Sequence, residues 1–323
     1  MIAREQLENN QVWIYLGTLA AAAGAGLVWT GIGSALEQAV PLTLGVLMYG
    51  MFSQIPFLRL KEALSNRRFI YALLTVNYLA IPLFVWFLTR FLPDHPPLLL
   101  GVYLVLLTPC IDYVIVFTHL GRGNEKLMLV STPLLFITQM LLLPVYLWMF
   151  MGREAADIVQ FKPFVEAFLG LIALPLAVAV LVQVWASRGR RGKKLLEASA
   201  WLPVPFMALT LFVIVASQIA KLSGAVELLR YAIPVYVVYM AVTPWISRLF
   251  ARLFRLDIGA GRALIFSGGT RNSLVVLPFA LALPGEAGAW VTSVIVAQTL
   301  VEIIGELIYI RLVPGVVLKE EAG

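Results

Sequence analysis

Long apolar runs separated by short polar segments extend from Val12 to Leu312. A helix needs about 20 mostly apolar residues to cross a bilayer, because lipid offers the backbone no hydrogen-bond partners. Ten runs meet this requirement, and we expect each to form a transmembrane helix. The predicted spans are residues 12–33, 38–56, 69–92, 97–119, 127–151, 163–187, 198–220, 227–247, 262–284 and 288–312. The pattern therefore predicts an all-α membrane protein with ten transmembrane helices in the lipid bilayer.

Composition and charge support this assignment. Hydrophobic residues make up 61% of the chain and charged residues 13%, about half the charged fraction of a soluble protein. With the N-terminus inside, 18 of the 24 Lys and Arg residues lie in inner segments, five lie in outer segments, and Arg271 lies within a span. Since Lys and Arg accumulate in cytoplasmic loops, we expect a cell-membrane protein with both termini cytoplasmic. The net charge of +6 then needs no nucleic-acid partner.

The most basic stretch, residues 188–194, follows the sixth span and is interpreted as a solvated loop that helps to set orientation. Its spacing does not match a phosphate-binding loop, so we expect no nucleotide hydrolysis. Five spans precede a midpoint near residue 160 and five follow it. An odd number of spans per half inserts the second half upside down, so the predicted units are inverted repeats at 1–160 and 161–323.

A short internal similarity gives the repeat a register. Gln139 and Gln298 end similar stretches in spans five and ten, at an offset of 298 − 139 = 159 residues. The same offset superimposes three pairs of residues in spans four and nine: Pro109 and Gly268, Cys110 and Gly269, and Asp112 and Arg271.

Spans four and nine each contain a helix-breaking signal at equivalent places. Pro109 removes a backbone donor, and the pair Gly268 and Gly269 weakens a helix. Paired breaks of this kind are the best sequence indication of a transporter binding site near the bilayer midplane. The alternative is a pair of kinks without function.

Ionisable groups within spans are costly and are functional candidates by default. Asp112 and Arg271 are the most deeply placed, and we expect them to pair with each other. The pair could be structural, or one residue could bind substrate while the other titrates, and the two roles are compatible. Glu302 follows Gln298 by one turn in span ten and extends a polar stripe. We interpret Glu306, one turn further, as a span-end residue.

Other chemistry finds little support. A single cysteine, Cys110, excludes an intrachain disulfide and a multi-cysteine metal site. His95 and His119 belong to no metal-binding or catalytic cluster. No nucleophile-elbow or zinc-protease motif is present. We therefore expect no enzyme activity, no metal and no cofactor.

Several segments resemble the bile acid, arsenite and riboflavin transporter superfamily, and most closely its arsenite-efflux permeases. Span two, from Val40 to Met51, is similar to the proline-leading, Gly- and Met-rich second span of that superfamily. Asn77 and Pro82 are similar to its Asn-Trp…Pro arrangement. The most specific segment is Thr108-Pro-Cys-Ile-Asp-Tyr-Val-Ile-Val-Phe followed by Gly123-Asn124, and Leu300-Val-Glu302 also matches.

The resemblance implies a panel domain, a core domain, and discontinuous helices four and nine that cross beside the substrate. It makes Cys110 the candidate thiol for metalloid transport. The candidate substrate-binding residues are Cys110, Asp112, Arg271, Asn272, Thr108, Ser267 and Thr270, and the candidate coupling or supporting residues are Asn77, Gln139, Gln298 and Glu302.

The chain also departs from those relatives. Residues 271–274 read Arg-Asn-Ser-Leu where the arsenite permeases have Asn-Asn-Phe-Glu, and Asp112 stands where they have a small residue. A fixed guanidinium would repel sodium, so we expect proton antiport, with efflux of arsenite or a related metalloid by alternating access. One alternative is a carrier of a small organic anion that binds Arg271. The other is a membrane structural or sensory protein that transports nothing.

The topology yields a direct prediction. In a variant with Cys110 replaced, single cysteines at either terminus or in residues 188–194 should react with an impermeant thiol reagent only from the cytoplasmic side. The measurement compares labelling of intact cells with labelling of inside-out vesicles. Labelling of the 188–194 segment from outside intact cells would overturn the span count.

Overall fold

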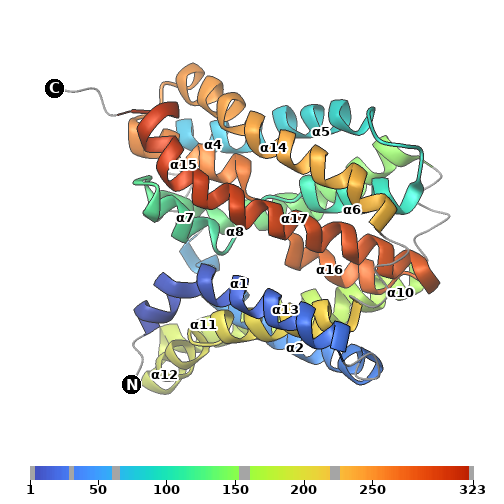
Figure 1. Ribbon diagram of the computed structural model, residues 1–323. Helices are drawn as coiled ribbons and strands as arrows, with labels where there is room; N and C mark the ends of the chain where they lie inside the picture. Colours follow the sequence, from blue (N-terminus) through green and yellow to red (C-terminus); the bar gives the residue numbers. More distant parts are fainter. Residues whose placement is uncertain (1–3, 29–32, 60–65, 153–160, 219–225, 320–323) are drawn as a thin grey trace. The chain divides into compact units, whose positions relative to one another are not determined.

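The computed structural model describes residues 4–28, 33–59, 66–152, 161–218 and 226–319. These ranges are helical apart from short connections, and they contain no β-sheet, although one isolated antiparallel bridge joins Pro109 to Arg271. The helices are shown in Figure 1. The predicted span ends at 29–33 and 218–220 reach or border the undescribed residues, and the basic residues Lys61, Arg153 and Lys221 lie outside the described ranges.

The chain forms two compact units. The first contains Met1–Gln54, Gln160–Val226 and Pro278–Ala289, and the second contains Ile55–Val159, Glu227–Leu277 and Trp290–Gly323. Each unit draws residues from both halves of the sequence. The predicted halves 1–160 and 161–323 are therefore not the compact units, and their relation by an inverted repeat stays a prediction.

The first unit is a helical bundle in which α13 packs against both α1 and α2, and α2 also packs against α11 (Figure 1). Its elements are α1 (Arg4–Val28), α2 (Gly33–Gln54), α10 (Phe161–Phe168), η3 (Leu169–Ala173), α11 (Leu174–Arg188), α12 (Arg190–Ser199) and α13 (Pro203–Gln218). A buried amide ties two of them together, because Gln183 Nε2 donates to the carbonyl of Phe52, 3.2 Å away.

The basic stretch after α11 is not the loop that we predicted. Residues Arg190–Ser199 form helix α12, since Lys, Leu, Glu and Ala are strong helix formers and only Gly189 interrupts the chain. The basic side chains of this stretch are exposed. Gly192 is the contact point with α11: a Cβ there would lie 2.5 Å from the backbone carbon of Trp185. The absence of a side chain lets the two helices approach closely.

The second unit holds the remaining helices. They are η1 (Phe57–Arg59), α4 (Arg67–Thr75), η2 (Val76–Ala80), α5 (Ile81–Thr89), α6 (Pro96–Leu106), α7 (Val114–Leu120), α8 (Glu125–Met151), α14 (Val226–Leu253), α15 (Ile258–Gly269), the start of α16 (Ser273–Leu281), most of α17 (Gly285–Leu312) and η5 (Val313–Val317).

Helices occupy all ten predicted segments within the described residues. Six are long and apolar enough to cross a membrane: Arg67–Thr89, Glu125–Met151, Val165–Arg188, Arg190–Ser217, Glu227–Leu253 and Gly285–Val317. The chain is therefore a multi-pass helical membrane protein. Predicted spans four and nine are each divided into two shorter helices, α6 with α7 and α15 with α16.

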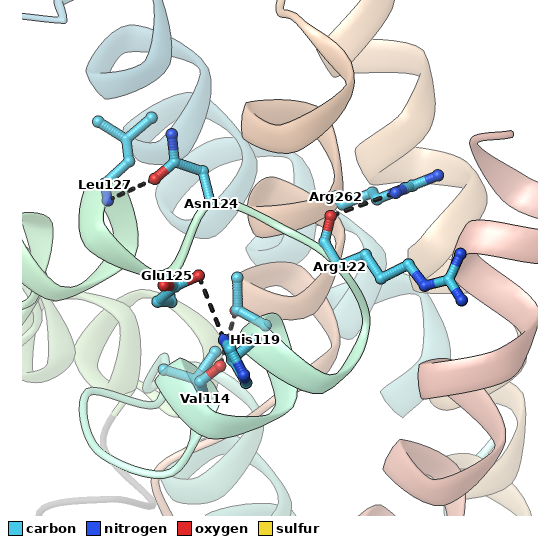
Figure 2. Close-up of polar contacts among 8 residues, drawn as sticks. Val114, His119, Arg122, Asn124, Glu125, Leu127 and Arg262 are labelled. Atoms are coloured by element: carbon cyan, nitrogen blue, oxygen red, sulfur yellow. Dashed lines mark hydrogen bonds and ion pairs between the residues drawn. The ribbon is translucent and has the colours of Figure 1, made fainter. Parts of the chain in front are cut away.

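The turn between α7 and α8 is fixed by polar contacts (Figure 2). Asn124 caps α8 by accepting a hydrogen bond from the amide of Leu127 at 3.0 Å, and His119 lies 3.5 Å from the carboxylate of Glu125. Arg122 adopts a left-handed conformation (φ 56°) and presents its carbonyl to the guanidinium of Arg262 at 3.2 Å. These contacts anchor α7 and α8 to the start of α15.

Three single turns of π-helix stand next to prolines. Elements η2 and η3 are followed two residues later by Pro82 and Pro175, and η5 contains Pro314. A proline has no amide hydrogen and crowds the preceding turn, so the wider turn relieves the helix. In η2 the wide turn carries Asn77, which is fully buried.

The close approach at Gly192 predicts a stability defect. Gly192→Ala should lower the melting temperature of the purified protein, because overpacking against backbone atoms costs about 1–3 kcal/mol. Gly24→Ala in α1 is the matched control, since a Cβ there meets no atom within 4 Å and alanine is the better helix former. An equal melting temperature for the two variants would show that α11 and α12 do not pack as described.

Candidate functional site

Two interrupted helices cross within the second unit, and their non-helical segments pair with each other. We call Leu107–Tyr113, between α6 and α7, and Thr270–Asn272, between α15 and α16, the crossover. The amide of Cys110 donates to the carbonyl of Thr270 at 3.1 Å, and the amide of Asn272 donates to the carbonyl of Thr108 at 2.8 Å. These reciprocal bonds replace part of the hydrogen bonding that each helix loses.

Proline and glycine play different parts in this arrangement. Pro109 lies inside the first break, as predicted from its missing donor. Gly268 and Gly269, which we predicted to break the helix, instead form the last two residues of α15, and the break begins at Thr270. A Cβ at Gly268 would lie 2.2 Å from Ser247 Oγ, and one at Gly269 would lie 2.4 Å from the Tyr309 ring. The glycines therefore admit α14 and α17 close to the crossover.

Arg271 is fully buried, and among the described residues its guanidinium forms no hydrogen bond with a carboxylate. Nη2 lies 2.8 Å from Asn77 Oδ1, 2.6 Å from the carbonyl of Ser267 and 2.8 Å from that of Gly268. Nη1 donates to the carbonyl of Leu106 at 3.4 Å. The acceptors are thus one amide side chain and the C-terminal ends of α15 and α6, where the helix dipole places partial negative charge.

Asp112 makes its hydrogen bonds within its own interrupted segment. Its carboxylate accepts from the thiol of Cys110 and from the amide of Tyr113, each at 2.7 Å. No ion pair within 4 Å joins Asp112 to Arg271, although both residues are among those that the structure describes. The predicted pairing is therefore wrong. Helix-end carbonyls and Asn77 take the place of the carboxylate for Arg271.

Glu302 of α17 joins the two sides of the crossover. Its Oε1 accepts from the Tyr113 hydroxyl at 2.7 Å, and its Oε2 accepts from the backbone amide of Arg271 at 2.8 Å. Gln298, one turn earlier, also donates to Oε2. Tyr113 additionally reaches the carbonyl of Arg271 at 3.1 Å. The carboxylate of Glu302 is therefore hydrogen-bonded to both interrupted segments at once.

Glu306 is a second buried carboxylate of α17 and is not the span-end residue that we expected. It is fully buried, and its Oε1 accepts from the Thr270 hydroxyl at 3.0 Å. Its Oε2 has no hydrogen-bond partner among the described residues. Two carboxylates one turn apart thus approach the same three-residue break, Thr270–Asn272.

The remaining candidate residues divide into three groups. Ser267 Oγ accepts from Asn77 Nδ2 at 3.0 Å, and both residues also contact the guanidinium of Arg271 in the crossover. Thr108 Oγ1 bonds the carbonyls of Leu104 and Val105 and closes the end of α6. Asn272 Oδ1 accepts from the Val275 amide at the start of α16, at 3.2 Å.

Gln139 of α8 is fully buried, but neither of its amide atoms has a partner among the described residues. The structure therefore does not connect Gln139 to the crossover. Its counterpart in the proposed repeat, Gln298, does reach Glu302.

Sequence reasoning overlooked Tyr113 and undervalued Glu306. A tyrosine three residues after Cys110 stands next to a predicted break, and a hydroxyl there can reach across the crossover, but many tyrosines in membrane helices lie at interfaces. Glu306 could have been recognised by its spacing from Glu302, since residues four apart share a helix face.

Comparisons with known proteins agree with this architecture. The sequence model of the Sodium Bile acid symporter family matches residues 41–225, which is more than half of the chain. The chain is also 25% identical to the arsenical-resistance protein Acr3 of Corynebacterium glutamicum over 298 residues, covering 86% of this chain and 77% of the relative. The chain therefore belongs to the Sodium Bile acid symporter family. It is a member of a transporter family and not an enzyme.

The site geometry predicts which residues are energetically coupled. Tyr113→Phe and Glu302→Gln should each lower the melting temperature, and their effects should not add. The first removes the donor of the 2.7 Å hydrogen bond and the second removes the negative charge of its acceptor, so both act on the same interaction. By contrast, the Asp112→Asn, Arg271→Gln double variant should recover none of the loss of either single variant, since the two side chains do not pair.

Thermal melting of the purified proteins in one detergent measures both cycles. If the Asp112 and Arg271 double variant is more stable than the less stable of the two single variants, the result would support an ion pair between these residues. Strict additivity for Tyr113 and Glu302 would contradict the described hydrogen bond.

Proposed function

We propose that this member of the Sodium Bile acid symporter family is a ten-span secondary transporter that exports arsenite or a related metalloid by alternating access, driven by protons. The spans are the ten helical segments, with α6–α7 and α15–α16 as discontinuous spans four and nine. Each half of the chain, 1–160 and 161–323, would be one of two inverted repeats. The positive-inside distribution supports a location in the cell membrane with both termini in the cytoplasm.

The observation that carries the proposal is the position of the thiol. Cys110 is the one cysteine of the sequence, and it lies in the non-helical crossover with its amide bonded to Thr270 and its sulfur against Asp112. Transporters bind substrates where discontinuous helices meet near the bilayer midplane. The similarity to an arsenical-resistance protein along most of the chain supports the same substrate class.

The chemistry of a thiol with arsenous acid is balanced and reversible. The sulfur forms an As–S bond while one As–O bond breaks, and the departing hydroxide leaves as water with the thiol proton. Asp112, which accepts the hydrogen bond of the thiol, is placed to relay that proton. Attack by water reverses the step and releases the metalloid, so Cys110 can bind without being consumed.

Glu302 is the proposed coupling carboxylate. It is fully buried and bonded to Tyr113 next to α7, to the backbone of Arg271 before α16, and to Gln298. Protonation removes the charge that these three donors stabilise, so it would loosen both halves of the crossover together. A proton can thereby alter the arrangement that holds the substrate.

A carrier for a small organic anion is the second candidate, and the family match favours it. In that function the guanidinium of Arg271 would hold the negative group of the substrate. The fully buried side chain is instead directed toward helix carbonyls and Asn77, which counts against a free anion-binding role.

Flux into proteoliposomes tests the function. We expect arsenite transport driven by an imposed proton gradient, with no gain from a sodium gradient and no transport of small carboxylates. Transport of a carboxylate without arsenite would establish the second candidate. Absence of flux for every solute in a correctly oriented, folded preparation would contradict a transport function.

Replacement of the thiol provides a residue-level test. Cys110→Ser should abolish arsenite flux while leaving the melting temperature close to that of the wild type, because the two side chains are nearly isosteric. Ser217→Ala in α13 removes a similarly small buried group from the first unit and should leave flux unchanged. Full arsenite transport by the Cys110→Ser variant would eliminate the thiol mechanism.

A further inference from the structure

The guanidinium of Arg271 occupies a cage of neutral oxygens. The side chain is 0% exposed, and its four acceptors are the carbonyls of Leu106, Ser267 and Gly268 and the amide oxygen of Asn77. None of these acceptors is a carboxylate. A buried cation is costly unless it is compensated. Among the described residues, every acceptor within hydrogen-bond distance of the guanidinium is a neutral dipole, and the carboxylates of Glu302 and Glu306 add attraction from further away.

The oxygens surround the guanidinium as ligands surround a metal cation, and they do not match its N–H groups one to one. Nη2 lies 2.6–2.8 Å from three oxygens but carries only two hydrogens. Nε has no hydrogen-bond partner among the described residues. At least one of these oxygens therefore faces the positive charge of Nη2 without a directed N–H bond to it.

The oxygens converge because the fold directs them. Leu106 is the last residue of α6, and Ser267 and Gly268 lie in the last turn of α15, so their carbonyls lack the partners of a continuing helix. Asn77 projects from the π-turn η2, and its Nδ2 donates to the carbonyl of Leu73 and to Ser267 Oγ, each at 3.0 Å. Those two bonds aim its Oδ1 at the guanidinium.

Neutral carbonyl and amide oxygens at the ends of interrupted helices are the ligands with which secondary transporters bind sodium. The family to which the chain belongs carries sodium in its name. This chain presents such ligands at the crossover and places a covalently attached cation among them.

We infer that the oxygens of Leu106, Ser267, Gly268 and Asn77 form a monovalent-cation site that the chain fills with its own guanidinium. Arg271 acts as a tethered substitute for a coupling ion, which makes the wild-type protein indifferent to sodium. Removal of the guanidinium opens the site to sodium. The inference extends the proposed function on the question of coupling, but it holds whatever the substrate is.

Ligand-dependent stability of the full-length protein tests the inference without a substrate. Melting temperatures of the wild type, Arg271→Ala and Arg271→Gln are compared in sodium chloride and in choline chloride at equal ionic strength. A ligand that binds only the folded state raises the melting temperature by an amount that grows with the logarithm of its concentration above the Kd. We expect no difference between the salts for the wild type and a rise that grows with sodium concentration for both variants.

Three further variants identify the source of the effect. Arg271→Lys keeps a cation in place and should show no sodium response. Addition of Asn77→Ala to Arg271→Ala removes one oxygen ligand and should weaken the response. Arg262→Gln is the matched control, because Arg262 in α15 is a second buried arginine that donates to backbone carbonyls, those of Leu318 and Arg122, and it should gain no sodium response. Its contact with Arg122 is drawn in Figure 2.

A higher melting temperature of the wild type in sodium chloride than in choline chloride would overturn the inference. Equal melting temperatures of the folded Arg271→Ala and Arg271→Gln variants in the two salts would also overturn it. If the variants cannot be purified in choline, recovery in sodium alone supports the site. Failure in both salts counts against it. Because no assay here uses arsenite, loss of the arsenite proposal would leave this result unaffected.

Discussion

Two backbone hydrogen bonds hold the centre of this protein together. A helix interrupted inside a membrane leaves amides and carbonyls that lipid cannot satisfy. Here the amides of Cys110 and Asn272 each find a carbonyl in the other interrupted segment. Each break is thus tolerable only in the presence of the other, and the polar side chains around them are placed by this mutual dependence.

The charges of the site follow from that geometry. Ends of α6 and α15 bring unpaired carbonyls together and attract the guanidinium of Arg271, while the freed backbone amide of the same residue attracts Glu302. One residue therefore supplies a cation to one side of the crossover and a donor to the other. Asp112 bonds to neither Arg271 nor Glu302, and it interacts with Cys110 and the amide of Tyr113.

Hydropathy was sufficient to predict the helical segments, because the bilayer requirement for long apolar runs is simple and strong. The break at Pro109 was predictable for a local reason, its missing amide hydrogen, whereas the glycine pair lies at the end of α15 and the second break begins only after it. The direction of the Arg271 side chain was not predictable in this way. Two opposite charges in equivalent spans suggested that Arg271 pairs with Asp112. Whether Arg271 meets a carboxylate or a set of helix-end carbonyls depends on which groups lie around it in three dimensions, and sequence spacing does not give that arrangement.

The same limit applies to helix α12. Its basic sequence favoured a loop, and the contact of Gly192 with α11 is seen only in the structure. It applies equally to Glu306, whose burial depends on the neighbouring break at Thr270. Local propensity fixed the elements in each case, and tertiary contact fixed their roles.

The wide turn η2 has a consequence for how such a protein can change. A π-turn is one residue longer than the α-turn it replaces, so losing a single residue from Val76–Ala80 would restore a regular helix while keeping the faces of α4 and α5 in phase. The span would survive that deletion, but the buried amide of Asn77 would be lost from its position. The oxygen ligand therefore rests on a one-residue insertion, a change that a lineage can make or reverse in a single step without rebuilding the membrane domain.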